Sequence, residues 1–217
     1  MTLARDGRPT IVEPGRGTKR ELLIATFIER VATVGFRRTR VDDVCRQAGV
    51  SIREWYEWFG KKDPTYLLVF GTLGGALLRK ARTAFEEEGG PWERRVRAGL
   101  EVVTAELAGK PVLTRFLMEC PHVDGGDAAL ARLLGRAHRV YLTDEIRGRA
   151  PAVPPAALES IATSLVVQPM MRYVEEGQLH RLPELVPWIV YYLTLDLLGP
   201  ERAAPLLPGR GSPAGQD

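Results

Sequence analysis

The stretch TRVDDVCRQAGVSIREWYEWFGKKDPTYLLVF, residues 39–70, decides the fold of this 217-residue chain. Apolar side chains recur at steps of three and four residues through 40–48, which predicts a short helix. Gly49 follows, and glycine permits the positive φ that a tight junction after a helix often needs. A second short helix is predicted over 52–58. Two such helices are typical of a helix-turn-helix unit, although short helical corners also occur in any helical bundle.

A capping box marks the start of the second helix. Ser51 precedes Glu54 by three positions, so each side chain can accept a hydrogen bond from the backbone N–H of the other residue. The sequence KKDP at 61–64 ends this helix. Pro64 suits the first turn of a longer helix, which we expect to reach about residue 88.

The rest of the chain is also predicted to be helical, so the fold class is all-α. Residues 1–17 contain Gly, Pro and Arg without periodicity, which predicts a flexible basic arm, and residues 201–217 are predicted to form a disordered tail. Between them we expect a domain over 18–66 that contains the helix-turn-helix and a larger helical domain over 67–200. Apolar periodicity predicts the first helix of the chain at about 19–34. It also predicts further helices in the larger domain at about 91–108, 111–120, 126–148, 155–177 and 183–198.

Composition and charge indicate a globular protein. Hydrophobic residues make up 45% of the chain and the net charge is only +3, which implies neither a disordered chain nor a polyanion coat. The excess of basic over acidic residues lies in the N-terminal part of the chain, because residues 1–64 hold thirteen Lys and Arg against nine Asp and Glu. Two cysteines, Cys45 and Cys120, and no early apolar signal segment favour a cytoplasmic protein without disulfides. The apolar stretch at 186–198 is shorter than the ~20 residues that span a bilayer, so we expect no membrane segment.

Residues 39–70 closely resemble the signature of the TetR family of transcription regulators. In that signature A-G-V-S is followed by G-T-hydrophobic-Y-x-H-F-x-S-K-E and a hydrophobic helix. The positions that match are Ala48, Gly49, Val50, Ser51, Tyr56, Phe59 and Lys62. The positions that depart are Arg53-Glu54 for Gly-Thr, Trp55 for an aliphatic residue, Trp58 for His, and Lys61 for Ser or Asn. The resemblance implies an N-terminal three-helix DNA-binding domain followed by helices for ligand binding and dimerisation.

The resemblance also implies contacts to the DNA backbone. In the family the Tyr and the Lys of the signature bind phosphates, so these roles fall to Tyr56 and Lys62, beside Ser51 at the start of the helix. Further cations that could hold the flanking backbone are Lys61, Arg37, Arg38 and Arg40.

Base contacts are expected from the outward side of the helix over 52–58. Arg53 favours the O6 and N7 atoms of guanine, and Ile52 can touch a thymine methyl group. A phosphate contact is an equally open role for Arg53. Glu57 is a candidate for base contact, but it is also consistent with a solvated helix face. Trp58 either packs on the scaffold or lies on the DNA backbone.

The predicted helices near the C-terminus carry apolar faces. These faces could form an intersubunit four-helix bundle or an intramolecular core. A homodimer with a palindromic operator is expected independently, because one short recognition helix contacts too few base pairs for useful specificity. The residues proposed for the dimer interface are Leu158, Ile161, Leu165, Trp188, Ile189, Tyr192 and Leu195.

Sulfur-containing and aromatic side chains could line a pocket for an apolar or amphiphilic ligand, although each is equally typical of a core. They are Phe116, Met118, Cys120, His122, Tyr141, Met170, Met171 and Tyr173. The histidines lack metal-ligand spacing, and no nucleophile-base pair, phosphate loop or paired-carboxylate motif is found. We therefore expect no metal, no cofactor and no enzymatic activity.

The sequence thus predicts a DNA-binding repressor that a small molecule releases from its operator. The alternative is a ligand-binding or protein-interaction module whose divergent helix over 52–58 does not contact DNA. Gly71, Gly74 and Gly75 interrupt the predicted helix over 64–88, which suggests either close packing or a hinge.

Overall fold

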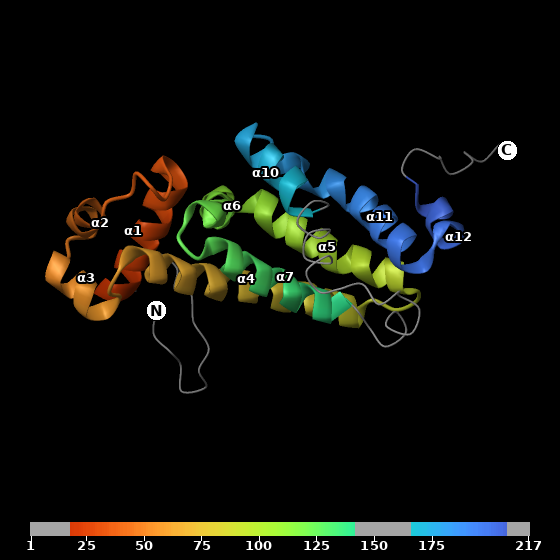
Figure 1. Cartoon of the computed structure of the whole chain (residues 1–217), viewed down its shortest axis with the longest axis horizontal. Helices are drawn as coiled ribbons and strands as arrows, with labels where there is room; N and C mark the ends of the chain where they lie inside the picture. Colours follow the sequence, from red (N-terminus) through yellow and green to blue (C-terminus); the bar gives the residue numbers. More distant parts are fainter. Residues whose placement is uncertain (1–17, 142–165, 208–217) are drawn as a thin grey trace. The chain divides into compact units, whose positions relative to one another are not determined.

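The computed structural model describes residues 18–141 and 166–207, and the regular secondary structure in these ranges is helical (Figure 1). The α-helices are α1 (Lys19–Val34), α2 (Val41–Ala48), α3 (Ile52–Trp58), α4 (Lys62–Glu87), α5 (Trp92–Gly109), α6 (Pro111–Met118), α7 (Gly126–Tyr141), α10 (Gln168–Glu175), α11 (Val186–Leu198) and α12 (Pro200–Ala203). The 3₁₀ turns are η1 (Cys120–His122), η3 (Leu179–Leu185) and η4 (Ala204–Leu206). The predicted all-α fold class is confirmed. None of the described helices is long and apolar enough to cross a membrane.

The three helices predicted first agree best with the structure. The bounds of α1, α2 and α3 match the predicted ranges to within one residue. Agreement is poorer later in the chain, where residues 183–185, predicted to begin the helix over 183–198, instead end the 3₁₀ segment η3. The predicted helical residues 142–148 and 155–165, like the arm over 1–17, lie outside the described residues.

The prediction of a disordered tail from residue 201 is wrong for its first residues. The helix α12 and the turn η4 continue to Leu206. Ala203 is fully buried, and Arg202 Nη2 lies 2.8 Å from Glu93 Oε2 on α5. This segment therefore packs against the molecule, a contact that its Pro- and Gly-rich composition does not reveal.

The chain divides into two compact units. The first comprises the described residues up to Gly75 together with Lys110–Leu130, and the second comprises Ala76–Gly109 and the described residues from Ala131 onward. The domain boundary expected after residue 66 therefore falls later. In addition, α6, η1 and the start of α7 belong to the first unit, although they follow it in sequence by more than thirty residues.

An aromatic core explains why α6 belongs to the first unit. Phe27 of α1, Trp55 of α3, Tyr66 of α4 and Phe116 of α6 are all fully buried. The ring centroids of Phe27 and Trp55 are 5.3 Å apart, and those of Tyr66 and Phe116 are 4.6 Å apart. The Tyr66 hydroxyl donates to the Phe116 carbonyl oxygen at 2.6 Å, and burial raises the pKa of Tyr66. Edge-to-face and tilted ring contacts of this kind add to the effect of area burial.

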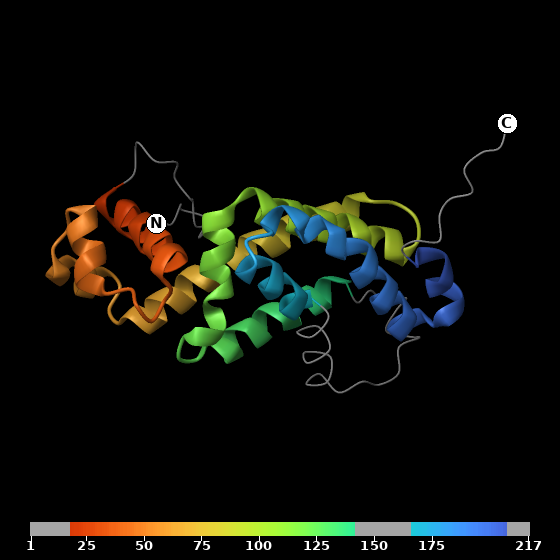
Figure 2. The same ribbon diagram turned by 90° about the horizontal axis from the view of Figure 1, so that it is seen from above.

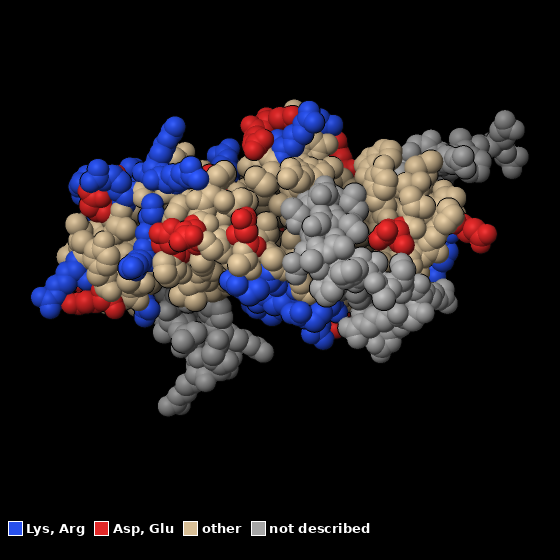
Figure 3. Space-filling model, viewed as in Figure 1, with Lys and Arg blue, Asp and Glu red and all other residues tan. Residues whose placement is uncertain are grey.

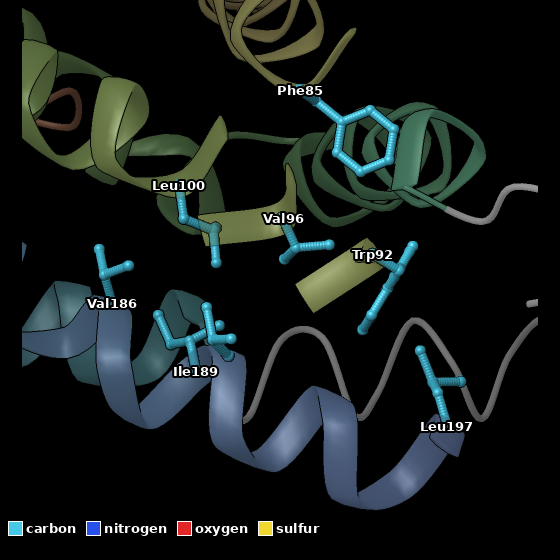
Figure 4. Packing of buried hydrophobic residues seen from close by; sticks show 8 residues of the cluster. Phe85, Trp92, Val96, Leu100, Val186, Ile189 and Leu197 are labelled. Atoms are coloured by element: carbon cyan, nitrogen blue, oxygen red, sulfur yellow. The ribbon is translucent and has the colours of Figure 1, made fainter. Parts of the chain in front are cut away.

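The core of the second unit is mostly aliphatic (Figure 4). Helices α5 and α11 lie side by side (Figures 1 and 2) and direct apolar side chains at each other. The indole N–H of Trp92 donates to the Tyr141 carbonyl oxygen at 2.6 Å, which satisfies a polar atom in this core. The fully or nearly buried members of the cluster are Phe85, Trp92, Val96, Leu100, Val186, Ile189, Val190 and Leu197.

Candidate nucleic-acid interface

The junction between α2 and α3 has the geometry that the sequence predicts. Gly49 adopts a left-handed conformation with φ 64° and ψ 34°. The N–H of Val50 donates to the Cys45 carbonyl oxygen at 2.9 Å and so closes the end of α2. Because a side chain is strained at this φ, the turn favours glycine.

The capping box at the start of α3 is confirmed. Ser51 Oγ accepts a hydrogen bond from the Glu54 N–H at 3.2 Å, and Glu54 Oε2 accepts one from the Ser51 N–H at 2.8 Å. The backbone and hydroxyl hydrogen bonds from Ser51 hold the pKa of the Glu54 carboxyl below its usual range. Glu54 is thus engaged in capping the helix.

Helix α3 has one buried and one exposed side. Trp55 is fully buried and its indole N–H donates to the Gly60 carbonyl oxygen at 2.9 Å, which anchors the helix. On the other side Ile52 is 48% exposed and Tyr56 is 57% exposed. Large apolar and aromatic side chains at these exposures are available to a partner.

Two charged side chains complete the exposed side. Arg53 Nε donates to Glu57 Oε1 at 2.7 Å, and both side chains are more than half exposed. Trp58 is half-buried, and its ring lies edge-on to that of Phe59 with centroids 6.4 Å apart. Of the two roles left open for Trp58, this contact favours packing on the scaffold.

Lys62 is turned toward the protein. Its Nζ donates to the carbonyl oxygens of Phe36 and Thr39, each at 3.0 Å, and lies 4.2 Å from the centre of the Phe36 ring. Burial lowers the pKa of Lys62. An ammonium group has three N–H donors, and the two carbonyl oxygens take up two of them, so one N–H is left for another partner.

The same turn is held from a second direction by Glu119, at the end of α6. Glu119 Oε2 accepts a hydrogen bond from the Phe36 N–H at 2.8 Å. We call this arrangement of Glu119 and Lys62 around the Phe36 backbone the turn clasp. It fixes the entry to α2, and sequence reasoning missed Glu119 because no local pattern connects residues 83 positions apart.

Basic side chains surround this region. Figure 3 shows Lys and Arg over the part of the first unit that holds α1 to α3, with carboxylates among them. Arg37, Arg38 and Lys61 are exposed. Arg40 is also exposed but pairs with Asp42, with 3.1 Å between Arg40 Nε and Asp42 Oδ1.

The eight residues proposed for a ligand pocket are divided between the two units. Phe116 and Cys120 are buried in the first unit, where the Cys120 thiol donates to the Gly126 carbonyl oxygen at 3.4 Å. In the same unit Met118 is half-buried and His122 is exposed. These four residues therefore belong to the first unit. The other four, which belong to the second unit, are Tyr141, Met170, Met171 and Tyr173.

Tyr141 differs from the other pocket candidates. Its hydroxyl oxygen is buried and forms no hydrogen bond with any described residue. Burial raises the pKa of Tyr141 to about 12. A Cβ atom on Gly99 would lie 2.7 Å from this oxygen, so the absence of a side chain at Gly99 makes room for the hydroxyl. Met170 is buried, and Met171 and Tyr173 are half-buried.

The residues proposed for a dimer interface point in different directions. Trp188 and Tyr192 of α11 are each 45% exposed and lie one helical turn apart, and Leu195 is half-buried. Ile189 is only 3% exposed and packs in the core of the second unit, so its placement at the interface is corrected. The remaining proposed residues, Leu158, Ile161 and Leu165, lie outside the described residues.

The structure bears on the roles left open for the glycines of α4. The helix continues without a break from Lys62 to Glu87. A Cβ atom on Gly71 would meet nothing within 4 Å, so close packing does not account for that glycine. The division between the two units falls directly after Gly75.

Comparison with known proteins shows which solved structures share this fold. No family model matches the sequence, and no curated protein matches it. Among solved structures, the fatty acid degradation regulator FadR from Bacillus halodurans superposes with a TM-score of 0.62 at 15% identity, over 83% of this chain and 99% of that one. A TetR-like transcriptional regulator from Rhodococcus sp. RHA1 gives a TM-score of 0.55 at 15% identity, over 87% and 100% of the two chains. A TetR family transcription regulator from Marinobacter aquaeolei VT8 gives 0.54 at 17% identity, over 79% and 94%.

These similarities agree with the motif in residues 39–70. At such identities they concern the fold, which is shared over almost the whole length of each regulator. The chain therefore has the fold of the TetR-type transcription regulators, as the resemblance of its helix-turn-helix sequence implies.

Proposed function

We propose that this protein is a DNA-binding transcription regulator of the TetR type. It acts as a repressor that binds a palindromic operator as a homodimer and leaves it when a small apolar or amphiphilic molecule binds. The observation that carries the proposal is the exposed side of α3, which a capping box and the buried Trp55 hold rigidly in a basic surface. A short, well-anchored helix of this kind is what enters a DNA major groove.

The DNA contacts follow from exposure and charge. Ile52 and Arg53, at the start of α3, contact bases, and Tyr56 contacts a phosphate. Lys61, Arg37 and Arg38 bind the flanking DNA backbone. Arg40 contributes to this binding when it is not paired with Asp42. Ser51 caps α3. Since Lys62 uses two donors on the turn before α2, we assign it the task of fixing that turn instead of a phosphate contact.

Dimerisation is supported by the exposed aromatic pair on α11. Trp188 and Tyr192 leave large aromatic side chains partly exposed on α11. Aromatic side chains are enriched at protein interfaces. A second copy of the chain covers them in this proposal. Two recognition helices then bind half-sites separated by about 34–36 Å along the DNA.

Ligand binding is supported by the Tyr141 hydroxyl. A buried hydroxyl without a hydrogen-bond partner costs roughly 1–3 kcal/mol, and a bound molecule that accepts or donates there removes this cost. The ligand acts by population shift, because it prefers a conformer whose recognition helices no longer match the two half-sites.

The proposal is tested by titrating the protein against a labelled DNA fragment from upstream of its own gene, at several salt concentrations. We expect binding that weakens with salt, and Lys61→Ala should reduce the salt slope by about one unit on every sequence. Arg172→Ala, which removes an exposed cation of the second unit, is the matched control and should leave the slope unchanged. An absence of binding at low salt would refute the proposal and favour a ligand-binding or protein-interaction module.

A further inference from the structure

The charged pair on the exposed side of α3 occupies an unfavourable place in the helix. Arg53 is the second residue of α3, where the unpaired N–H groups of the helix start disfavour a cation. Glu57 lies one turn later and accepts the hydrogen bond from Arg53 Nε at 2.7 Å. An Arg followed by Glu is also the less favourable order for a pair four residues apart. Local helix stability therefore does not account for an Arg at this position.

Two similar pairs elsewhere in the chain show what is particular about this one. Arg82 with Glu86 on α4, and Arg172 of α10 with Glu176 directly after that helix, have the same spacing and the same Nε contact, at 2.6 and 2.9 Å. Arg172 lies in the last turn of its helix, where a cation is favoured, and Arg82 lies far from the start of α4. Of these three pairs, only the one on α3 has its Arg in the first turn of a helix and lies on the side that the proposed function directs at DNA.

We propose that Glu57 is a positioning residue that presents Arg53 to a guanine of the operator. This inference rests on the proposed function. The contact with Glu57 occupies Nε, and neither Nη atom of Arg53 has a hydrogen-bond partner among the described residues. These two nitrogens form the planar fork that donates two parallel hydrogen bonds to O6 and N7 of guanine.

Charge decides between guanine and phosphate as the partner of Arg53. The pair has no net charge, and an Arg53 that gripped a phosphate would bring the Glu57 carboxylate toward the same anion. The O6 and N7 edge of guanine is an uncharged acceptor, so Glu57 causes no such repulsion there. Of the two roles that the sequence leaves open for Arg53, the pair with Glu57 thus favours base recognition.

The first part of the test is selection of binding sites from random duplex DNA. The wild-type protein is expected to select guanine at one position in each half-site. Arg53→Ala should lose between about 5-fold and 150-fold in preference for guanine at that position and keep its preferences elsewhere. Arg53→Lys, which retains the charge but lacks the planar fork, should lose part of this preference while binding non-specific DNA as well as the wild type does. A uniform loss of affinity in Arg53→Ala, with a salt slope smaller by about one, would show a phosphate contact and overturn the inference.

The second part tests whether Glu57 acts through Arg53. Glu57→Gln should lower the preference for guanine about 3-fold or more in the wild-type background and have no effect on it in Arg53→Ala, because coupled residues are not additive. An equal effect in both backgrounds would overturn the positioning role. Glu86→Gln on α4 removes an equally exposed carboxylate from an equivalent pair and is the matched control. If the wild-type protein selects no sequence and shows no salt-dependent binding, the proposed function fails, and the inference fails with it.

Discussion

Helices α3 and α11 both bury one side and expose the other, but they expose different chemistry. The buried side of α3 is centred on Trp55 and that of α11 on Ile189 and Val190. The exposed side of α3 carries an ion pair and a phenol, whereas that of α11 carries Trp188 and Tyr192. Charged and hydrogen-bonding groups suit a hydrated polyanion, and an aromatic pair suits an apolar protein surface. The buried sides thus maintain the fold, and under the proposed function the exposed sides suit two different partners, DNA for α3 and a second copy of the chain for α11.

The largest effect is expected at the buried side of α3. Trp55→Ala removes the ring that packs against Phe27 and leaves a cavity, which should lower the free energy of unfolding by about 3–5 kcal/mol. Denaturant titration measures this change, and DNA binding should be lost with it. A variant with wild-type stability would mean that α3 is not anchored through Trp55.

The turn clasp should have the next largest effect. Glu119→Ala leaves the N–H of the buried Phe36 without its acceptor, at a cost of roughly 1–3 kcal/mol in the free energy of unfolding. Since the clasp fixes the entry to α2, DNA affinity should fall on all sequences alike. Glu119→Gln keeps an oxygen acceptor and should recover most of the stability. Equal losses in the two variants would indicate that the charge of Glu119, not its hydrogen bond, is what matters.

Loss of the cap of α3 should have a smaller effect. Ser51→Ala removes the acceptor for the Glu54 N–H, which should destabilise the protein by about 0.5–2 kcal/mol. Fraying of the first turn of α3 should also reduce the preference for specific bases. Ser51→Asp keeps an acceptor and should restore the stability seen by thermal unfolding. No recovery in that variant would argue against the cap as the cause.

The smallest effect on the folded chain is expected at the exposed side of α11. Trp188→Ala and Tyr192→Ala should each change the stability of the monomer by only about 0.5–1 kcal/mol, because nearly half of each side chain is exposed. They should nevertheless weaken the dimer, which sedimentation at several protein concentrations measures. Ile189→Ala is the matched control, since it should destabilise the chain by about 2–5 kcal/mol through its core. A dimer unaffected by either aromatic substitution would place the interface elsewhere.

The parts of the first unit that could be predicted are those with local causes. Gly49 adopts the predicted positive φ, and Ser51 and Glu54 form the predicted capping box, because both features depend on residues at most three positions apart. Such signals are visible in the order of the residues alone.

Other parts of the candidate site depend on contacts between distant residues. Lys62 matches the family signature, yet its ammonium group turns toward the carbonyl oxygens of Phe36 and Thr39. Phe116 is an aromatic residue of the kind that lines ligand pockets, but it packs in the core against α1 and α4. Helical spacing identifies an apolar or polar side without identifying what covers it.

By itself the sequence determined the all-α class, the bounds of α1 to α3 and the helix-turn-helix motif, because hydrogen bonds and caps within a few residues specify these features. Only the tertiary structure decided that α6 joins the first unit, that Glu119 and Lys62 clasp the turn before α2, and that Ile189 faces inward while Trp188 faces outward. The physical reason is that burial and pairing depend on which segments meet in space, and such contacts join residues as far apart in sequence as Phe36 and Glu119, or Glu93 and Arg202.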